Sequence, residues 1–513
     1  MNTILLEVVN PNVNVTSILP EVIVAVAGIV VMLYDCFAPK QKVVTGAISL
    51  IGLILATIAL FALWSGNYDF SKAWNGMIVF DNLRMSFTLV VMFVTAMTIL
   101  ISTVWTDREE VPVGEYHSLL LFATVGMMFM ASGNDMVIIF LGLETLSLAT
   151  YVMAGLRKSD LKSNESALKY FILGSFASAF LLYGMALIYG ATAATNITEI
   201  AAKIGTANFP ALLLVGGAML LIGFGFKIAT VPFHVWTPDV YEGAPSPITA
   251  FMAAGPKAAG FASFMRIFVL GFPVVAGATA TNYLHGSWVS ALVVMAILTM
   301  VVGNVAAIVQ NNVKRMLAYS SIAHAGYALV GFIGAGVAKT VDARDAAMTA
   351  VAFYLLTYAV TNLGAFAVVT LLGGKNDRRS DFEDYNGIGF KSPILAFTLS
   401  LFMLSLLGLP LTAGFIGKIL VFSPAIQSGE PLLTIMVVVA VITTAISAYY
   451  YLRLIVVMFF KERLTEWTEP KIPASLAAVL LITVLGVFYL GLFSDRVLDI
   501  FKQIPATVKA EIK

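Results

Sequence analysis

The feature that most constrains this chain is a succession of apolar windows, each long enough to cross a bilayer. A helix needs roughly 20 apolar residues to span a hydrocarbon core about 30 Å thick. The 513-residue sequence contains about fourteen such windows. Their extents are 17–37, 43–64, 79–103, 116–133, 135–156, 165–191, 208–236, 247–272, 287–310, 316–337, 346–373, 393–424, 431–460 and 473–493. Ten-residue alternation, typical of a transmembrane barrel, is absent from the sequence, which therefore predicts an all-α polytopic membrane protein.

Composition excludes several function classes. The single cysteine, Cys36, cannot by itself hold an iron–sulfur cluster, a structural zinc ion or an internal disulfide. The four histidines lie on separate segments without metal-ligand spacing, and no glycine-rich loop follows a strand. We therefore expect no metal site, no bound cofactor and no NADH site in this chain. The net charge of +1 is spread over loops, which argues against a nucleic-acid partner.

Loop charges predict the orientation of the chain. Basic residues gather on alternate connections, in the set Lys40, Lys42, Arg108, Arg157, Lys158, Lys162, Lys314, Arg315, Lys375, Arg378, Arg379, Lys391, Lys461, Arg463 and Lys471. The positive-inside rule makes these connections cytoplasmic and places both termini on the non-cytoplasmic side. The start "MNTILLEVVN" lacks the basic region of a cleavable signal peptide. We expect a multi-pass protein of a bacterial plasma (inner) membrane.

Four charged residues stand out inside the apolar windows, far from other charges: Glu144, Lys227, Lys257 and Lys418. A charge at the centre of a membrane helix costs about 2.5 to 3.5 kcal/mol, so each needs a reason. One acid cannot neutralise three lysines, so these four residues cannot form a fully paired structural network. Desolvation lowers the pKa of an unpaired lysine, and a nearby glutamate raises it again. A lysine placed in this way can act as a switched proton relay. The alternatives are buried ion pairs that fix helix register, or lysines that snorkel to the headgroups.

Helix-breaking residues occur in two windows. Pro232 interrupts the seventh window, and Pro410, with Gly408 and Gly414, interrupts the twelfth. Windows four to eight and nine to thirteen form two blocks of five, and the broken window is the fourth of each. Because five is odd, we expect the second block to be inverted relative to the first. The predicted units are 1–115 (three N-terminal helices), 116–275 (first repeat), 286–462 (second, inverted repeat) and 463–513 (C-terminal helix and tail).

Three stretches carry a family resemblance. The runs "FKIATVPFHVWTPDVYEGAPSPITAF", "KRMLAYSSIAHAGY" and "GLPLTAGFIGKILVF" resemble the antiporter-like membrane subunits of respiratory complex I and of Mrp cation/proton antiporters. "WTPDVYEGAPSPITAF", with the lysine of "AAGPKAAGF", is similar to the N-subunit branch. The resemblance implies a transverse proton path through Glu144, Lys227, Lys257 and Lys418. It leaves His234 and His324 as possible connecting residues, each equally consistent with a structural role.

The resemblance also implies a setting. A membrane-arm subunit of NADH-quinone oxidoreductase would couple electron transfer from NADH to quinone to outward proton pumping. FMN and iron–sulfur clusters would lie in partner subunits, and this chain would contact other membrane-arm subunits, lipid, protons and, only through the complex, quinone. The alternatives are an Mrp-type cation/proton antiporter subunit, a subunit of a related hydrogenase or dehydrogenase, and a scaffold without transport. Arg453, in the thirteenth window, could pair with an acid of a neighbouring subunit or serve a proton exit route.

Overall fold

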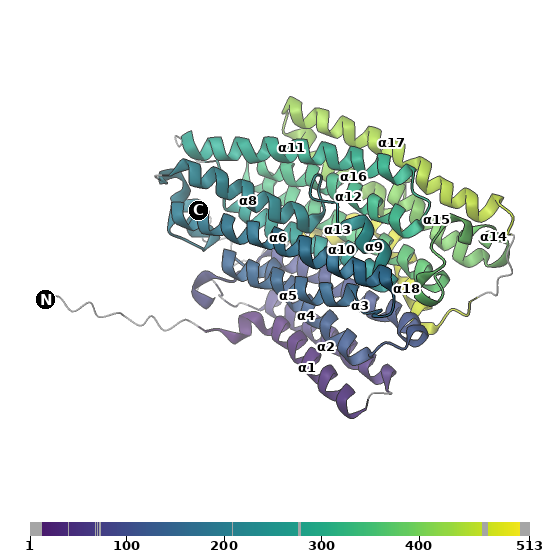
Figure 1. Cartoon of the computed structure of the whole chain (residues 1–513). Helices are drawn as coiled ribbons and strands as arrows, with labels where there is room; N and C mark the ends of the chain where they lie inside the picture. The colour runs from purple at the N-terminus through teal and green to yellow at the C-terminus, as the bar shows by residue number, and fades with distance from the viewer. Residues whose placement is uncertain are drawn as a thin grey trace.

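The computed structural model describes residues 13–38, 41–66, 68, 70, 73–207, 209–274, 279–463 and 470–502. Lys40, the predicted boundary at 275 and the tail beyond 502 lie outside these residues. The described segments form helices and connections, with only isolated β-bridges between three pairs of connections and no named strand in these ranges. The predicted all-helical class is therefore confirmed. Figure 1 shows the helices stacked roughly side by side, with α1 and α2 at one edge and α17 at the other.

The helices follow the predicted windows closely. The first three are α1 (Leu19–Phe37), α2 (Lys42–Ser65) and α3 (Asn82–Glu109). The first block of five comprises α4 (Val113–Ser132), α5 (Met136–Ala154), α6 (Leu161–Thr192), α8 (Pro210–Ile228) with α9 (Thr237–Gly243), and α10 (Ser246–Met265). The second comprises α11 (Thr279–Ile308), α12 (Val313–Gly336), α13 (Val341–Leu372), α15 (Pro393–Leu407) with α16 (Ala413–Gln427), and α17 (Pro431–Phe460). The chain continues through α18 (Ala474–Leu492) and α19 (Ser494–Lys502), and the short α7 (Ile197–Lys203) and α14 (Ile388–Lys391) lie in connections.

Twelve helices within the described ranges are long and apolar enough to cross a membrane. The buried, 20-residue α10 and the broken pair α15 and α16 account for the other two predicted spans. Both predicted breaks are present. After α8, Ala229 adopts a left-handed conformation (φ 62°), and after α15, Gly408 does so (φ 95°), so each helix stops inside its apolar window.

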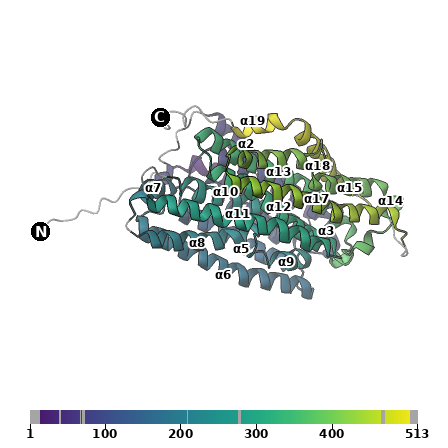
Figure 2. The same ribbon diagram turned by 90° about the horizontal axis from the view of Figure 1, so that it is seen from above.

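Three helices form the centre of the bundle. Every residue of α10 is buried, and 94% of the most apolar stretch of α12 and of α13 is buried as well. In α6 and α17 the corresponding share is only 33%, so these helices present apolar side chains to the surroundings. Figure 2 shows α6 along an outer edge with α10 and α12 further in. Lys257 of α10 and Lys314 of α12 are therefore buried, with exposures of 2% and 1%, whereas Arg315 at the start of α12 stays partly exposed.

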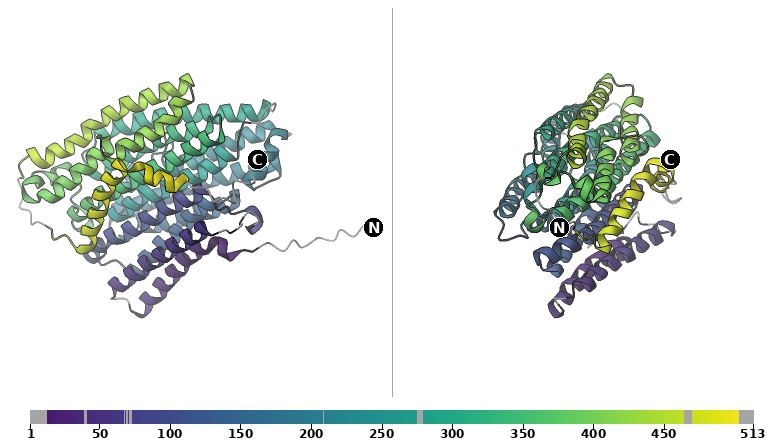
Figure 3. Two further views of the ribbon diagram at one scale, coloured as in Figure 1. Left: turned by 180° about the vertical axis from the view of Figure 1, so that it is seen from behind. Right: turned by 90° about the vertical axis from the view of Figure 1, so that its right-hand side faces the viewer.

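The basic connections meet at one end of the bundle. Lys42 pairs with Asp107 (3.0 Å), and Lys314 and Arg157 both pair with Asp377 (3.3 Å each). The two described ends of the chain both contact the beginning of α3. The backbone oxygen of Ser17 accepts from Arg84 (2.8 Å) and that of Lys502 accepts from Asn82 (3.3 Å), as expected for an even number of spans. Figure 3 shows α18 and α19 in yellow at the rear of the bundle.

Candidate functional site

Of the four charged residues predicted from the sequence, the three lysines lie in the interior of the bundle and Glu144 lies nearer its surface. The three lysines are almost completely buried, with exposures of 4% for Lys227, 2% for Lys257 and 5% for Lys418. Glu144 is half-buried. None of the three lysines reaches solvent by snorkelling, so each must be satisfied by protein groups.

Glu144 and Lys227 are linked through α5 and α6. The Ser178 hydroxyl donates to Glu144 Oε1, and Lys227 Nζ donates to Ser147 Oγ at 2.8 Å. Ser147 lies three residues after Glu144 on α5, which brings both side chains to one side of that helix. Ser147, Ser178 and Lys227 also line a small cavity of about 10 Å³, enough for roughly one water molecule. Glu144 and Lys227 form no direct ion pair among the described residues. Ser178, which donates to Glu144, and the water-sized cavity that Ser178 shares with Lys227 lie between them.

Close packing of α8 and α10 brings Lys227 near the helix of Lys257. Gly260 lies one turn after Lys257 and faces Lys227. A Cβ atom at Gly260 would lie 3.5 Å from Lys227 Cγ and 3.0 Å from Cγ2 of Ile228. The absence of a side chain there lets the two helices approach, which places Lys227 beside the helix that carries Lys257.

Lys257 joins the first block of helices to the second. Its Nζ donates to the backbone oxygen (2.8 Å) and to the hydroxyl (2.5 Å) of Ser321 on α12. The Tyr241 ring lies 6.0 Å from the same nitrogen. Lys257 thus has polar partners from α12 and an aromatic neighbour from α9, although no acid pairs with it among the described residues.

His324 continues the polar row from Ser321, which lies one turn before it on α12. Its Nδ1 is 2.6 Å from the Tyr354 hydroxyl, and its Nε2 is 3.2 Å from the Tyr451 hydroxyl. Its ring also packs edge-on against Tyr327 at a centroid distance of 5.5 Å. Of the two candidate connecting histidines, His324 is the one that the structure places between the surroundings of Lys257 and those of Lys418.

Lys418 binds the end of a broken helix. Its Nζ donates to the backbone oxygens of Leu406 (3.0 Å) and Leu407 (2.9 Å), the last residues of α15. These carbonyls have no partner further along the helix because the chain turns away at Gly408. The same nitrogen lies 4.9 Å from the centre of the Tyr327 ring. The negative end of the α15 dipole thus stabilises the charge of Lys418.

His234 is separate from this row. It lies in the connection between α8 and α9 and is half-buried. Its buried Nδ1 has no hydrogen-bond partner, and no contact joins it to the four charged residues within the described part of the chain. The structure therefore places His234 beside the helix break and not in a continuous chain of partners.

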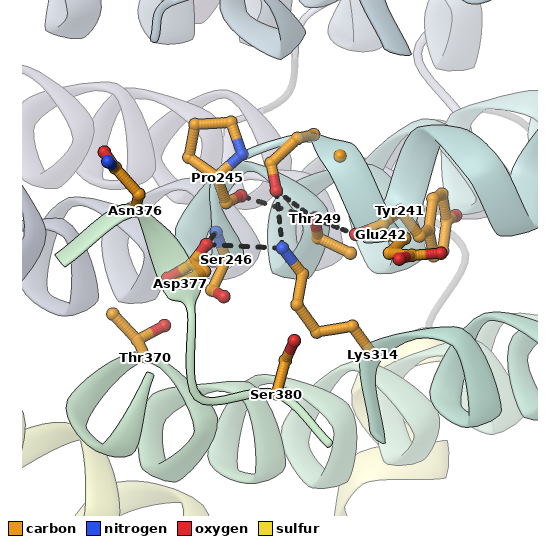
Figure 4. A network of polar contacts seen from close by, with 12 residues as sticks. Tyr241, Glu242, Pro245, Ser246, Thr249, Lys314, Thr370, Asn376, Asp377 and Ser380 are labelled. Carbon is orange, nitrogen blue, oxygen red and sulfur yellow. Dashed lines mark hydrogen bonds and ion pairs between the residues drawn. The ribbon is translucent and has the colours of Figure 1, made fainter. Parts of the chain in front are cut away.

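Sequence analysis missed a buried cluster around Asp377, in the loop after α13. This side chain is 3% exposed and contacts Arg108 (3.4 Å), Arg157 (3.3 Å) and Lys314 (3.3 Å). It also accepts the backbone N–H of Ser246 at 2.9 Å, and Figure 4 shows Lys314 and Ser246 converging on it. Burial alone raises the pKa of Asp377, but Lys314, Arg157 and Arg108 together hold this pKa below its usual value.

The position of Asp377 could not be inferred from the polar loop that contains it. The sequence did contain one relevant signal. Basic residues occur at the ends of several separate windows, and such residues need an acidic partner if they are buried together.

Arg453, which was expected to pair with a neighbouring subunit or to serve a proton exit route, finds its partners within the chain. It donates to the backbone oxygens of Ile308 (3.3 Å) and Gln310 (2.9 Å) and to the side chain of Asn311 (2.9 Å), so it fixes the connection between α11 and α12.

Comparison with known proteins places the chain in a family. The profile described as "NADH:quinone oxidoreductase/Mrp antiporter, TM" matches residues 133–447. The NADH-quinone oxidoreductase subunit N of Trichlorobacter lovleyi is 43% identical over 496 residues, which cover 96% of this chain and 97% of that protein.

Solved structures agree with this placement. A chain of respiratory complex I from Thermus thermophilus superposes with a TM-score of 0.76 at 36% identity, covering 94% of this chain and 98% of that one. A chain of the Mrp complex from Dietzia sp. shares the fold at a TM-score of 0.79, but with 20% identity. The chain belongs to the NADH:quinone oxidoreductase/Mrp antiporter transmembrane family.

Proposed function

We propose that this chain is the N-type membrane-arm subunit of an NADH-quinone oxidoreductase and moves protons outward across a bacterial inner membrane. FMN and iron–sulfur clusters of partner subunits would carry electrons from NADH to quinone, and other membrane-arm subunits would flank this chain. The subunit N of Trichlorobacter lovleyi and the complex I chain from Thermus thermophilus support this assignment, because each aligns with nearly the full length of this chain. The basic face would be cytoplasmic and both termini would lie outside.

A row of polar side chains through the bundle carries the proposal. It runs from Glu144 through Ser178 and the water-sized cavity to Lys227, and the α8–α10 contact separates Lys227 from Lys257. Beyond Lys257 the row continues with Ser321, then His324 one turn further along α12, and Lys418, which shares the neighbour Tyr327 with His324. Its members come from both blocks, which we propose to be inverted repeats spanning 116–275 and 286–462. Buried lysines with few counter-charges are suited to holding and releasing protons, and they would repel other cations.

The geometry supports a switching role for Glu144. While its carboxylate is charged, it stabilises a proton on Lys227 through Ser178 and the water-sized cavity that Ser178 and Lys227 line. When that charge is neutralised or moved, the proton on Lys227 loses this support and can pass toward Lys257. From Lys257, the hydroxyl of Ser321 and the ring of His324 offer sites that both donate and accept hydrogen bonds.

Two observations favour the complex I assignment over an Mrp antiporter or a scaffold. Identity to the named subunit N is 43%, against 20% to the Mrp chain, where the likeness shows the fold alone. All four charged residues are present, and the three lysines are buried, which a scaffold that had lost transport would not require. The same fold also occurs in other membrane complexes, so activity must be tested directly.

The test is NADH-driven proton uptake by inverted membrane vesicles that carry Lys257→Ala. We expect both acidification and NADH oxidation to fall sharply although the complex assembles. The matched control is Lys339→Ala, which removes an exposed lysine and should leave both rates unchanged. Pumping at the wild-type rate in an assembled Lys257→Ala complex would show that this lysine is structural and that the proposed path is wrong.

A further inference from the structure

A second site lies where α3, α13 and the segment before α18 meet at the basic end of the bundle. A cavity of about 270 Å³ opens there, lined by side chains of two kinds. Arg108, Arg379 and Lys471 supply positive charge, whereas Val104, Leu371 and Leu372 supply apolar surface. No acidic residue belongs to the described lining. The cavity is separate from the row of buried lysines.

Two of the three cations are available to an external anion. The side chains of Arg379 and Lys471 are exposed, and neither forms an ion pair with any described residue. The backbone N–H of Arg379 donates to the backbone oxygen of Gly373 at 2.9 Å, and this hydrogen bond fixes the backbone position of Arg379 in the loop. Arginine presents a planar fork of donors that matches phosphate oxygens, and lysine adds a point charge.

The apolar part of the lining points to a lipid rather than a free ion. Val104 lies near the end of α3, and Leu371 and Leu372 end α13, so all three belong to membrane-spanning helices. Lys471 lies three residues before α18 begins. The cations thus lie where these helices end, and the apolar side of the cavity is formed by the last turns of α3 and α13. Basic pockets of this kind between helices bind lipid headgroups.

We propose that this cavity binds the phosphate of an anionic phospholipid, with an acyl chain along the apolar wall. Arg108 links the site to the centre of the molecule. Its Nη1 donates to the Thr370 oxygen (2.9 Å), and its Nη2 lies 3.4 Å from Asp377. A bound phosphate would therefore contact the arginine that also pairs with Asp377.

The first test counts lipids on the intact complex. The wild type and the double variant Arg379→Gln/Lys471→Gln would be purified in mild detergent, and retained phosphatidylglycerol would be measured by mass spectrometry. We expect the variant to retain about one phosphatidylglycerol fewer per complex. The control is Lys375→Gln/Lys391→Gln, which removes two exposed charges of the same face that do not line the cavity. Equal retention in all three complexes would overturn the proposal.

The second test separates a lipid from free phosphate. The complex would be placed in nanodiscs of phosphatidylcholine alone, and its thermal unfolding would be followed after adding either phosphatidylglycerol or millimolar inorganic phosphate. We expect phosphatidylglycerol to raise the unfolding temperature of the wild type and of the control, and not that of the Arg379→Gln/Lys471→Gln variant. If inorganic phosphate gives the same variant-sensitive shift and phosphatidylglycerol adds nothing, the site is one for free phosphate and the lipid assignment is wrong.

Discussion

The carboxylate of Asp377 accepts a hydrogen bond from the backbone N–H of Ser246 at 2.9 Å, so a loop of the second block caps the first turn of α10. A negative charge at a helix N-terminus is stabilising, and here it is buried. The same carboxylate also pairs with Arg108, Arg157 and Lys314. One side chain thus connects α3, the α5–α6 connection, α10 and α12.

Asp377→Asn should be strongly destabilising. The substitution keeps the shape but removes the charge that the buried Arg157 and Lys314 and the partly exposed Arg108 share. Breaking a buried pair in this way costs about 3 to 5 kcal/mol. We expect a lower unfolding temperature of the purified complex and less assembled complex in the membrane. Asp495→Asn, on the exposed α19, is the control and should change neither. Wild-type stability of Asp377→Asn would mean that the cluster is solvated.

Acid should weaken the same cluster. The pKa of Asp377 is lowered in the folded protein, so its contribution is complete above the unfolded value near 4 and is lost as the pH falls through the lower folded value. The unfolding temperature of the wild type should therefore fall more steeply below about pH 4 than that of Asp377→Asn. The measurement is thermal unfolding across a pH series, and parallel curves for the two proteins would contradict the assignment.

Gly408→Ala should impair pumping as well as stability. Gly408 has φ 95°, where a side chain costs about 1 to 2 kcal/mol, and a methyl group there would lie 3.4 Å from Cδ of Lys418. Gly429→Ala is the matched control, since it has φ 73° but no atom within 4 Å. Both variants should lose similar stability, whereas only Gly408→Ala should slow NADH-driven acidification. Equal pumping in the two would show that the surroundings of Lys418 tolerate change.

Gly260→Ala tests the contact between the first two lysine-bearing helices. Its methyl group would lie 3.0 Å from Ile228 Cγ2, and overpacking of this kind costs about 1 to 3 kcal/mol. We expect slower pumping because α8 and α10 must move apart. Gly286→Ala, on α11 with open space around it, should instead be neutral or stabilising by up to about 1 kcal/mol. Pumping rates in vesicles, normalised to assembled complex, decide between these outcomes.

Local sequence patterns were sufficient for the helices and their breaks. The length of each apolar window fixes where a span can begin and end. Gly408 and Pro410 predict a helix break from the local sequence alone, independently of how the helices pack. The four charged residues were also visible, because a charge in an apolar window is conspicuous without knowledge of its neighbours. The structure buries the three lysines and half-buries Glu144, and the relay role of all four remains a prediction.

The partners of those charges could not be predicted from the sequence. Lys257 and Ser321 are 64 positions apart, and Ser321 resembles many other serines in apolar windows. His324 and His234 were equal candidates, and only packing brings Tyr354 and Tyr451 to one of them. Asp377 was missed because its neighbours in sequence are polar loop residues, whereas its neighbours in space come from four other elements. Such pairings depend on how helices pack, which no local pattern encodes.

The helix α10 is held at both ends by carboxylates from other parts of the chain. Asp377 caps its beginning, and just past its end Arg266 makes paired bonds to Asp81 at 2.7 and 2.8 Å. Because all of its residues are buried as well, sliding or tilting this helix would disturb both anchors and the whole interior at once. Lys257 therefore sits on a helix that is anchored at both ends, and we expect side chains and half-helices around it to move more readily than α10 itself.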